Sequence, residues 1–498
     1  LGIINVVTEL PNIVVVMSDQ QKATASHLYG NTFCETPSME RLAREGVLFD
    51  NAITPHPLCM PARVAFWTSQ FPHSSGSRRN ETPMPMDAEH AWRIWKKHGY
   101  TTGLIGKNHC FNRLEDQALF DVWNPYPGAN NRTCGMEWFR SDKDLKRVSD
   151  AVKQMPQQTP SFGYGSTDLP LEDHSTGLIA GQATRFIESN SKKPFALWVS
   201  FPDPHEPWIA PKSYTDMFPA NRIELPPQRH SEFADGTAPE RNVVLHDILN
   251  WRDDNIEDVY GVMGAYYAMV RFVDDGLGQI LDCLEKNDIR ENTIVVFCSD
   301  HGDFMGEHGM TCKGGVFYDC LTRVPLIFSW PSRIPCDIRQ ESMVNLIDVV
   351  PTLLELQGFE KPLRMQGDLL PVVTNSNEKK YTFSEYGCGG QAFSRSDLKK
   401  LSKPWGRQAL MKSLQWREAE GRRKMIRTKD WKFVHDPMGD KDELYNLKDD
   451  PWELHNVCDC SEHTSIRSEL SVRLGDWSIE TEGDVPAPLP EPEKYLLS

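Results

Sequence analysis

The chain has 498 residues, enough for a large α/β domain and a smaller second one. Its 54 Lys and Arg residues against 70 Asp and Glu residues give a formal net charge of −16, which argues against nucleic acid and anionic membranes as main partners. An anionic substrate is still compatible with this charge, because a pocket on an acidic protein can be locally basic.

Targeting signals are weak in this sequence. It contains no run of about eighteen apolar residues, so no membrane span is predicted. Residues 1–10 lack the positive flank of a signal peptide, but the numbering begins at Leu1 and an export signal could have been removed. In that case we expect a periplasmic or secreted protein. The twelve cysteines follow no regular spacing, so no disulfide can be assigned from the sequence. The oligomeric state is also left open by the sequence.

Strands and helices alternate over most of the chain. Residues 12–17 form a continuous β-branched run, typical of a strand buried on both faces of a parallel sheet. Further strands are predicted at residues 47–53, 102–105, 195–201, 293–298 and 325–330, and helices at 38–45, 61–70, 90–98, 176–188, 258–286 and 345–357. This order predicts an α/β fold with a large, mainly parallel sheet sandwiched by helices. Residues 110–175 and 211–253 predict loops.

The last part of the chain has a different pattern. A polar segment at residues 375–380 is typical of a linker. Short strands are predicted beyond it at residues 381–386, 424–427, 431–434 and 443–447, and a final helix at 466–477. Because no helices are expected between these strands, they predict a small antiparallel sheet. We therefore expect a catalytic α/β domain at residues 1–375 and a C-terminal α+β subdomain at residues 376–498.

The motif Cys59-Met60-Pro61-Ala62-Arg63 places a thiol beside a predicted helix start. Proline is favoured in the first helical turn, and the N-terminus of a helix favours anions. The guanidinium of Arg63 is a fork suited to a tetrahedral oxyanion. The motif is short, and its five residues are equally compatible with an inert, buried cysteine before a helix.

Polar side chains also follow four of the predicted strands. They are Asp19 after the first, Lys107 and His109 after the third, Asp203 and His205 after the fourth, and Asp300 and His301 after the fifth. Ligands of open parallel sheets bind at the carboxyl ends of the strands. One strand-end Asp can be a helix cap and one His a structural residue, but four such ends together predict a site.

The residue types at these strand ends indicate the chemistry. Asp19, Asp300 and His301 form a suitable ligand set for a divalent cation, with Ca²⁺ or Mg²⁺ favoured by the oxygens and Mn²⁺ compatible with the imidazole.

Basic residues near this predicted cation complete the site. Arg63, Lys107 and Lys313 would neutralise an anionic tetrahedral ester and its transition state. His109 and His205 are the candidate proton-transfer groups, since imidazole titrates near neutral pH.

These motifs together resemble the type I sulfatases of the alkaline phosphatase superfamily, and the resemblance covers most of the chain. The elements that match are Asp19-Gln20, Cys59-x-Pro61-x-Arg63, Gly106-Lys107-Asn108-His109, Pro204-His205, Ser299-Asp300-His301-Gly302, Lys313, Arg323-Val324-Pro325-Leu326, and Asp442-Glu443-Leu444-Tyr445-Asn446-Leu447 with Asp450-Pro451. They follow one another in family order and at family-like spacing. The resemblance implies an alkaline phosphatase-like fold.

The resemblance also implies a mechanism. A maturing enzyme would convert Cys59 into formylglycine, whose hydrate is a gem-diol with one oxygen on the metal, Ca²⁺ being favoured. That oxygen attacks sulfur, and His205 together with Lys313 protonates the departing alcohol. His109 then removes a proton from the remaining hydroxyl, which expels sulfate. Arg63, Lys107, His205 and Lys313 would bind the substrate.

The sequence departs from the family pattern in three places. Many relatives have two consecutive aspartates where this chain has Ser18-Asp19. Many have Asn where His301 stands, and the Asp-His pair resembles the phosphonate monoester hydrolase, choline sulfatase and iduronate sulfatase branches. Trp67-Thr68-Ser69 replaces the usual Leu-Thr-Gly. These departures concern the metal and the modification more than the fold.

Three functions are compatible with these residues. The first is hydrolysis of a sulfate ester on a carbohydrate, with Trp138 and Trp208 as candidates for sugar stacking. The second is hydrolysis of a phosphonate monoester or phosphodiester, or of an aryl or choline sulfate, by the same chemistry. The third is a non-catalytic binding protein, which would have no need of Lys107, His109, His205 and Lys313 together.

Overall fold

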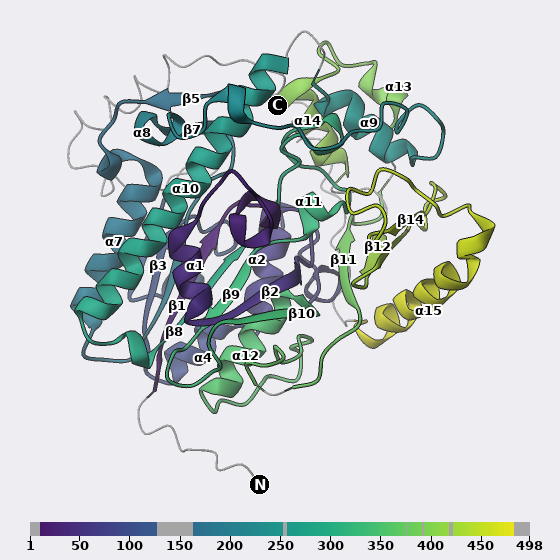
Figure 1. Ribbon diagram of the computed structural model, residues 1–498. Helices are drawn as coiled ribbons and strands as arrows, with labels where there is room; N and C mark the ends of the chain where they lie inside the picture. Colours follow the sequence, from purple (N-terminus) through teal and green to yellow (C-terminus); the bar gives the residue numbers. More distant parts are fainter. Residues whose placement is uncertain are drawn as a thin grey trace.

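The centre of the computed structural model is a sheet of eight strands in the described residues, which are 10–126, 163–251, 256–374, 376–390, 393–417 and 422–482 (Figure 1). Its strand order is β10-β2-β9-β8-β1-β6-β3-β4. The strands are β1 (Asn12–Ser18), β2 (Gly46–Ile53), β3 (Thr101–Gly106), β4 (Val122–Pro125), β6 (Phe195–Ser200), β8 (Thr293–Ser299), β9 (Leu326–Ser329) and β10 (Ile338–Asn345).

The four strands that end in candidate site residues are direct neighbours. β8, β1, β6 and β3 pair in parallel, so their carboxyl ends lie at one edge of the sheet. β9 is antiparallel to both β2 and β8, while β10 and β4 are parallel to their neighbours. The prediction of a large, mainly parallel sheet is confirmed.

Helices cover both faces of this sheet because its strands are apolar on both sides. In β1, Ile13 and Val15 belong to a core with α2 (Cys59–Thr68), α4 (Ala91–Lys97) and α12 (Val349–Leu356). The alternate residues Val14 and Val16 belong to a second core, with α1 (Pro37–Arg44), α7 (Ser175–Asn190) and α10 (Ile256–Lys286). Every residue of β1 is buried, as expected for a central strand of a two-sided sheet.

A smaller antiparallel sheet follows along the chain and lies beside the large one (Figure 1). It consists of β11 (Thr382–Tyr386), β12 (Arg423–Arg427), β13 (Trp431–His435) and β14 (Glu443–Asn446), with α15 (Thr464–Glu480) packed on it. The predicted antiparallel sheet is confirmed. The expectation of no helices between its strands is wrong, because α13 (Arg395–Leu398) and α14 (Gly406–Arg417) lie between β11 and β12. The division into residues 1–375 and 376–498 stays a prediction.

The segments predicted as loops contain regular structure. The first has α5 (Leu114–Gln117), β4 and β5 (Tyr164–Thr167), although residues 127–162 lie outside the described ones. The second predicted loop segment contains α8 (Lys212–Thr215) and α9 (Glu240–Leu249). Strand β7 (Trp208–Pro211), which comes just before it, pairs with β5. The remaining short elements are α3 (Pro72–Ser75), α11 (Asp319–Thr322) and 3-10 turns at Ala23–Ala25, His27–Tyr29, Leu171–Asp173, Ala220–Arg222, Arg290–Asn292, Glu307–Gly309, Leu346–Asp348 and Ser461–His463.

Two observations bear on the cysteines and on membranes. The eleven cysteines in the described part of the chain are all free, and Cys134 lies outside it. Within the same part, no helix has both the length and the apolar character needed to cross a membrane.

Candidate active site

The strand pairing brings two carboxylates side by side. β1 and β8 are in register at Ser18 and Ser299, so the next residues, Asp19 and Asp300, leave the sheet together. The turn after β2 then approaches them, because the Thr54 hydroxyl donates to the main-chain oxygen of Asp300 over 2.6 Å. This turn leads directly to Cys59, the first residue of α2.

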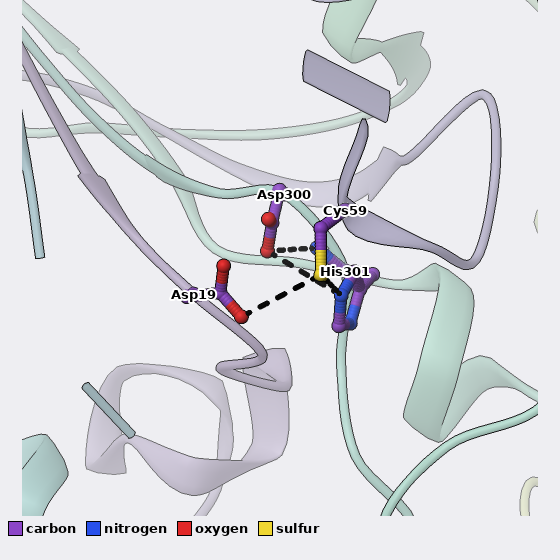
Figure 2. A group of neighbouring side chains, drawn as sticks. All are labelled: Asp19, Cys59, Asp300 and His301. Atoms are coloured by element: carbon purple, nitrogen blue, oxygen red, sulfur yellow. Dashed lines mark hydrogen bonds and ion pairs between the residues drawn. The ribbon is translucent and has the colours of Figure 1, made fainter. Parts of the chain in front are cut away.

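Four side chains predicted as metal ligands meet at this point (Figure 2). Asp19, Cys59, Asp300 and His301 are all buried, and each offers one ligand atom within 4.8 Å of the others. The Sγ atom of Cys59 is 3.0 Å from His301 Nε2 and 3.8 Å from Asp19 Oδ1. Such a spacing is compatible with one ion at about 2.0–2.6 Å from each ligand.

The orientation of His301 fits this interpretation. Its Nδ1 lies 2.9 Å from the main-chain oxygen of Gly302, which can only accept a hydrogen bond. Nδ1 therefore carries the proton, and the lone pair of Nε2 faces the other three ligands. Metal-binding histidines are commonly held in this way. The donor set of two carboxylates, one imidazole and residue 59 thus fits a divalent cation.

Arg63 bridges the two carboxylates from one turn further along α2. Its Nε donates to Asp300 Oδ2 and its Nη2 to Asp19 Oδ2, each over 2.8 Å. Its Nη1 donates to Ser200 Oγ over 2.8 Å and to the main-chain oxygen of Lys107 over 3.0 Å. Burial alone would lower the pKa of the guanidinium, but Asp300 and Asp19 raise it above its ordinary value.

These contacts favour a structural task for Arg63. Its side chain has no exposed surface, and each of its nitrogens donates to a protein acceptor. The guanidinium holds Asp19 and Asp300 in place and balances their charge. Its predicted contact with substrate stays a prediction.

Two lysines that are far apart in the sequence, Lys107 and Lys313, lie close to Cys59. Lys107 Nζ is 2.5 Å from Asp19 Oδ2 and 3.9 Å from Cys59 Sγ. Lys313 Nζ is 3.3 Å from the same sulfur. Burial raises the pKa of the Cys59 thiol, but Lys107, Lys313 and His301 outweigh it and hold this pKa well below its usual value. Residue 59 therefore stands in a strongly cationic environment.

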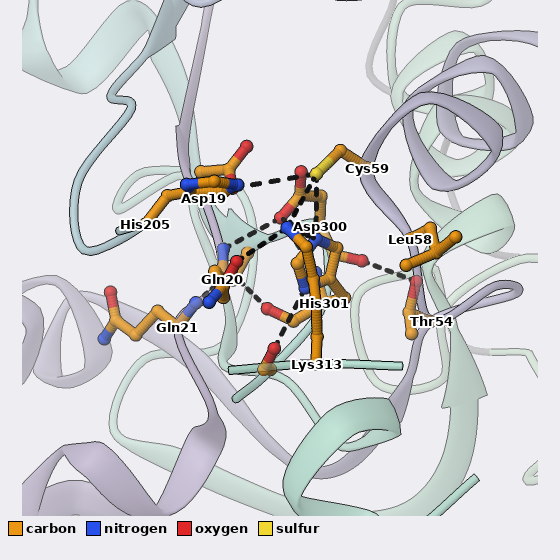
Figure 3. A network of polar contacts seen from close by, with 12 residues as sticks. Asp19, Gln20, Gln21, Thr54, Leu58, Cys59, His205, Asp300, His301 and Lys313 are labelled. Atoms are coloured by element: carbon orange, nitrogen blue, oxygen red, sulfur yellow. Dashed lines mark hydrogen bonds and ion pairs between the residues drawn. The ribbon is translucent and has the colours of Figure 1, made fainter. Parts of the chain in front are cut away.

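Two histidines complete the surroundings of residue 59. His109 makes a side-chain hydrogen bond with Cys59, and burial lowers the pKa of its imidazole. His205 Nε2 lies 4.0 Å from Asp19 Oδ1, and a quarter of this side chain, 25%, is exposed (Figure 3). All the residues predicted as catalytic thus lie in one cluster with the four predicted ligands.

The start of α2 differs from the expectation. The helix begins at Cys59, two residues before the predicted start at Pro61. The Met60 N–H donates to Asn80 Oδ1 over 3.0 Å, Pro61 has no N–H, and the Ala62 N–H donates to Leu58 O over 3.1 Å. The Met60 and Ala62 N–H groups are therefore not free to bind an anion, and the side chains of Lys107, Lys313 and His301 supply positive charge near residue 59.

Several residues of the site have no strong sequence signal. Gln20, Glu206 and Asp303 follow Asp19, His205 and His301 within two positions, and Gln20 contacts both carboxylates. Burial, and then the charge of Glu206, raise the pKa of Asp303 to about 7. The one signal in the sequence that could have indicated these three residues is that each stands next to, or two positions after, a predicted site residue.

The predicted sugar-stacking role of Trp208 is wrong. Its side chain has 0% exposure and lies in the core formed with α10, because β7 runs beneath the surface along that helix. Trp138 lies outside the described residues.

Away from this site, a cavity of about 460 Å³ lies between the large and small sheets. Its lining is charged, but the charges satisfy one another: Arg339 pairs with Asp50 over 2.5 Å, and Arg427 with Asp319 over 2.7 Å. It contains none of the residues of the candidate active site.

The four buried candidate ligands, with Lys107 and Lys313 beside Cys59, are the arrangement expected of a hydrolase that acts on esters of tetrahedral oxyanions. Comparison with known proteins makes the class more specific. The sequence profile of the sulfatase family matches residues 11–359, well over half of the chain. The chain belongs to the sulfatase family. It is a sulfuric ester hydrolase.

One relative agrees with this assignment, and two solved structures have the same fold. An N-acetylglucosamine-6-O-sulfatase of Bacteroides thetaiotaomicron is 25% identical over 93% of this chain and 85% of its own length. The phosphonate monoester hydrolase of Agrobacterium radiobacter has the same fold, with a TM-score of 0.76 at 21% identity over 95% of this chain and 96% of that one. A protein solved in complex with its substrate D-glucosamine-2-N,6-O-disulfate has a TM-score of 0.71 at 23% identity over 96% and 99% of the two chains.

Replacement of Arg63 should destabilise the fold. We expect Arg63→Met to lower the free energy of unfolding by about 3–5 kcal/mol, because Asp19 and Asp300 would stay buried without their counter-charge. Urea unfolding followed by circular dichroism measures this. The control is Arg44→Met, which removes an exposed pair with Glu40 and should cost less than about 1 kcal/mol. Equal losses in the two variants would contradict the proposed bridge.

Proposed function

We propose that this protein hydrolyses a sulfate ester on a carbohydrate, with formylglycine made from Cys59 as nucleophile and a divalent cation beside it. The observation that carries the proposal is the position of Cys59 Sγ. It lies among three further ligand atoms, with Lys313 Nζ at 3.3 Å and Lys107 Nζ at 3.9 Å. A structural cysteine has no need of such surroundings.

The sulfur of Cys59 stands here for the oxygens of the modified residue. Formylglycine, as its hydrate, has two hydroxyl groups. One attacks the sulfur atom of the substrate's sulfate ester, and deprotonation of the other expels sulfate. A thiol cannot perform the second task, because its carbon bears no hydroxyl. The unusually cationic setting of residue 59 suits a group that must be ionised, or nearly so, at neutral pH.

We assign the proton transfers to His205, Lys313 and His109. His205 and Lys313 hold protons for the oxygen of the departing alcohol, and His109, in contact with residue 59, takes the proton from the second hydroxyl. Lys107 and Lys313 also neutralise the sulfate group. Attack by the first hydroxyl frees one proton, which balances the proton delivered to the alcohol. The proton that His109 removes is the one released overall by hydrolysis of the ester, and water restores the hydrate after sulfate has left.

Asp19, Asp300, His301 and residue 59 would hold the cation. When bound, it would act as a Lewis acid that stabilises negative charge on oxygen. Ca²⁺ is our first choice, because two of the protein ligands are carboxylates, while His301 keeps Mn²⁺ as an alternative and Mg²⁺ is the third.

Sulfated sugars are the substrate class that the relatives support. One matched protein is an N-acetylglucosamine-6-O-sulfatase, and another is named an ulvan-active sulfatase. The second candidate function is hydrolysis of a phosphonate monoester or phosphodiester, which is favoured by the Asp300-His301 pair that this chain has in common with that branch. A choline-sulfatase is also among the relatives, at 26% identity.

A substrate panel tests the choice between these functions. We expect the highest kcat/KM for one member of a set of sulfated mono- and oligosaccharides. Choline sulfate, 4-nitrophenyl sulfate, bis(4-nitrophenyl) phosphate and a phenylphosphonate ester serve as comparisons. A phosphodiester or phosphonate turned over faster than every sulfate would favour the second function.

Mass spectrometry tests the nucleophile. The peptide that contains Cys59, from protein made in a host with the maturing enzyme, should have the mass of formylglycine or its hydrate. Cys298 is a matched control, since it is also buried but lies inside β8, and it should stay a thiol. Fully active protein with an unmodified Cys59 would refute the mechanism.

Removal of one carboxylate tests the cation. Asp300→Ala should lose the bound metal and reduce kcat to background, measured as metal content after equilibration with Ca²⁺, Mg²⁺ or Mn²⁺ and as turnover. The control is Asp274→Ala, a buried carboxylate that accepts hydrogen bonds from the Ser38 and Met39 N–H groups of α1. It should keep its metal. Metal retained by the Asp300 variant would argue against this ligand set.

A further inference from the structure

Gln20 occupies an unusual place for a neutral side chain. Its Oε1 accepts a hydrogen bond from Lys313 Nζ over 2.6 Å. Its Nε2 donates to Glu206 Oε2 over 2.8 Å and to Asp303 Oδ2 over 2.5 Å. The opposite amide orientation would set N–H groups against an ammonium and an oxygen against two carboxylates. The neighbours of Gln20 therefore define its orientation, and Gln20 in turn holds Lys313.

Glu206 makes a second set of contacts, with His205. Its main-chain oxygen lies 2.7 Å from His205 Nδ1, and its carboxylate oxygen Oε2 lies 3.3 Å from the same nitrogen. Because these oxygens accept, Nδ1 carries a proton. The opposite nitrogen, Nε2, faces the site near Asp19. The main-chain oxygen of residue 206 thus determines which nitrogen of His205 faces the site, and the Glu206 carboxylate adds a negative charge beside the protonated Nδ1.

Glu206 is placed to act as an anion. Its side chain is only 9% exposed. Burial raises the pKa of this carboxyl group, but the charges of His205 and Lys313 outweigh it and lower the pKa below its ordinary value. One buried carboxylate therefore contacts His205 directly and Lys313 through the amide of Gln20.

We propose that Glu206 is a positioning residue for protonation of the departing alcohol, acting on His205 directly and on Lys313 through Gln20. The inference rests on the proposed function, in which His205 and Lys313 deliver that proton. It also concerns the substrate class. Alkyl alcohols, including sugar hydroxyls, are poor leaving groups that need this proton, whereas 4-nitrophenol leaves readily as an anion. The Glu206 contacts are therefore expected to matter most for unactivated esters.

The test is the dependence of kcat/KM on the leaving group. Wild-type enzyme, matured at Cys59, and Glu206→Leu are compared on a graded series from 4-nitrophenyl sulfate through phenyl sulfate to an alkyl sulfate. General acid catalysis contributes about 10²–10⁴-fold. We expect the variant to lose on the order of 10²-fold with the poorest leaving groups and less than about tenfold with 4-nitrophenyl sulfate. A uniform loss across the series would overturn the inference.

Two further variants separate positioning from a general structural effect. Glu206→Gln retains an acceptor for Gln20 Nε2 and should restore part of the activity on the alkyl sulfate. Gln20→Leu, which removes the bond to Lys313 and leaves Glu206 in place, should steepen the leaving-group dependence as Glu206→Leu does. If Glu206→Leu does not fold, the Gln20 variant alone decides, and an unchanged dependence there would overturn the proposal.

Matched controls distinguish failure of the inference from failure of the proposed function. Glu232→Leu removes another buried carboxylate paired with a histidine, His308, at 2.7 Å, and should leave the dependence unchanged. His205→Asn is the reference for loss of the acid. If it steepens the dependence and Glu206→Leu does not, the inference is wrong and the proposed function stands. If His205→Asn does not steepen it, the assignment of His205 as proton donor is wrong.

Discussion

The bridge from Arg63 to Asp19 and Asp300 is the interaction on which the rest of the site depends. Two carboxylates side by side at zero exposure would repel each other and favour protonation. Desolvation of each charge costs several kcal/mol, and the hydrogen bonds of the guanidinium offset it only because their geometry is good. With one oxygen of each carboxylate held by Arg63, Asp19 Oδ1 lies 3.8 Å from Cys59 Sγ and Asp300 Oδ1 lies 3.8 Å from His301 Nε2.

The fold explains why these groups can meet. Strands β8, β1, β6 and β3 are far apart in sequence but adjacent and parallel in the sheet, so their carboxyl ends present Asp300, Asp19, His205 and Lys107 at one edge. The small C-terminal sheet also packs against the helix that carries Cys59. Its core includes Ala65 of α2, so the helix that begins with Cys59 is packed between the two sheets. The position of Cys59 is therefore determined by packing against both sheets.

The site divides into parts with different physical tasks. Acidic and imidazole ligands suit a cation, the lysines suit the sulfate group, and the histidines suit proton transfer near neutral pH. Behind them, Gln20 contacts both Glu206 and Asp303, and none of the three is a predicted ligand. This second group supports the side of the site where Lys313 and His205 lie, because Gln20 contacts Lys313 and Glu206 contacts His205.

The sequence by itself determined the elements whose signal is local. The apolar runs of β1, β6 and β8 and the polar residues that end them were predictable, because burial on two faces requires such runs. Strand β10 was missed, since its sequence I-R-Q-E-S-M-V-N has an edge-like polar pattern. Only the tertiary structure decided that Trp208 is buried, that Arg63 bridges two carboxylates, and that Gln20 meets Glu206, 186 positions away. Such contacts join segments distant in sequence, and no local pattern encodes them.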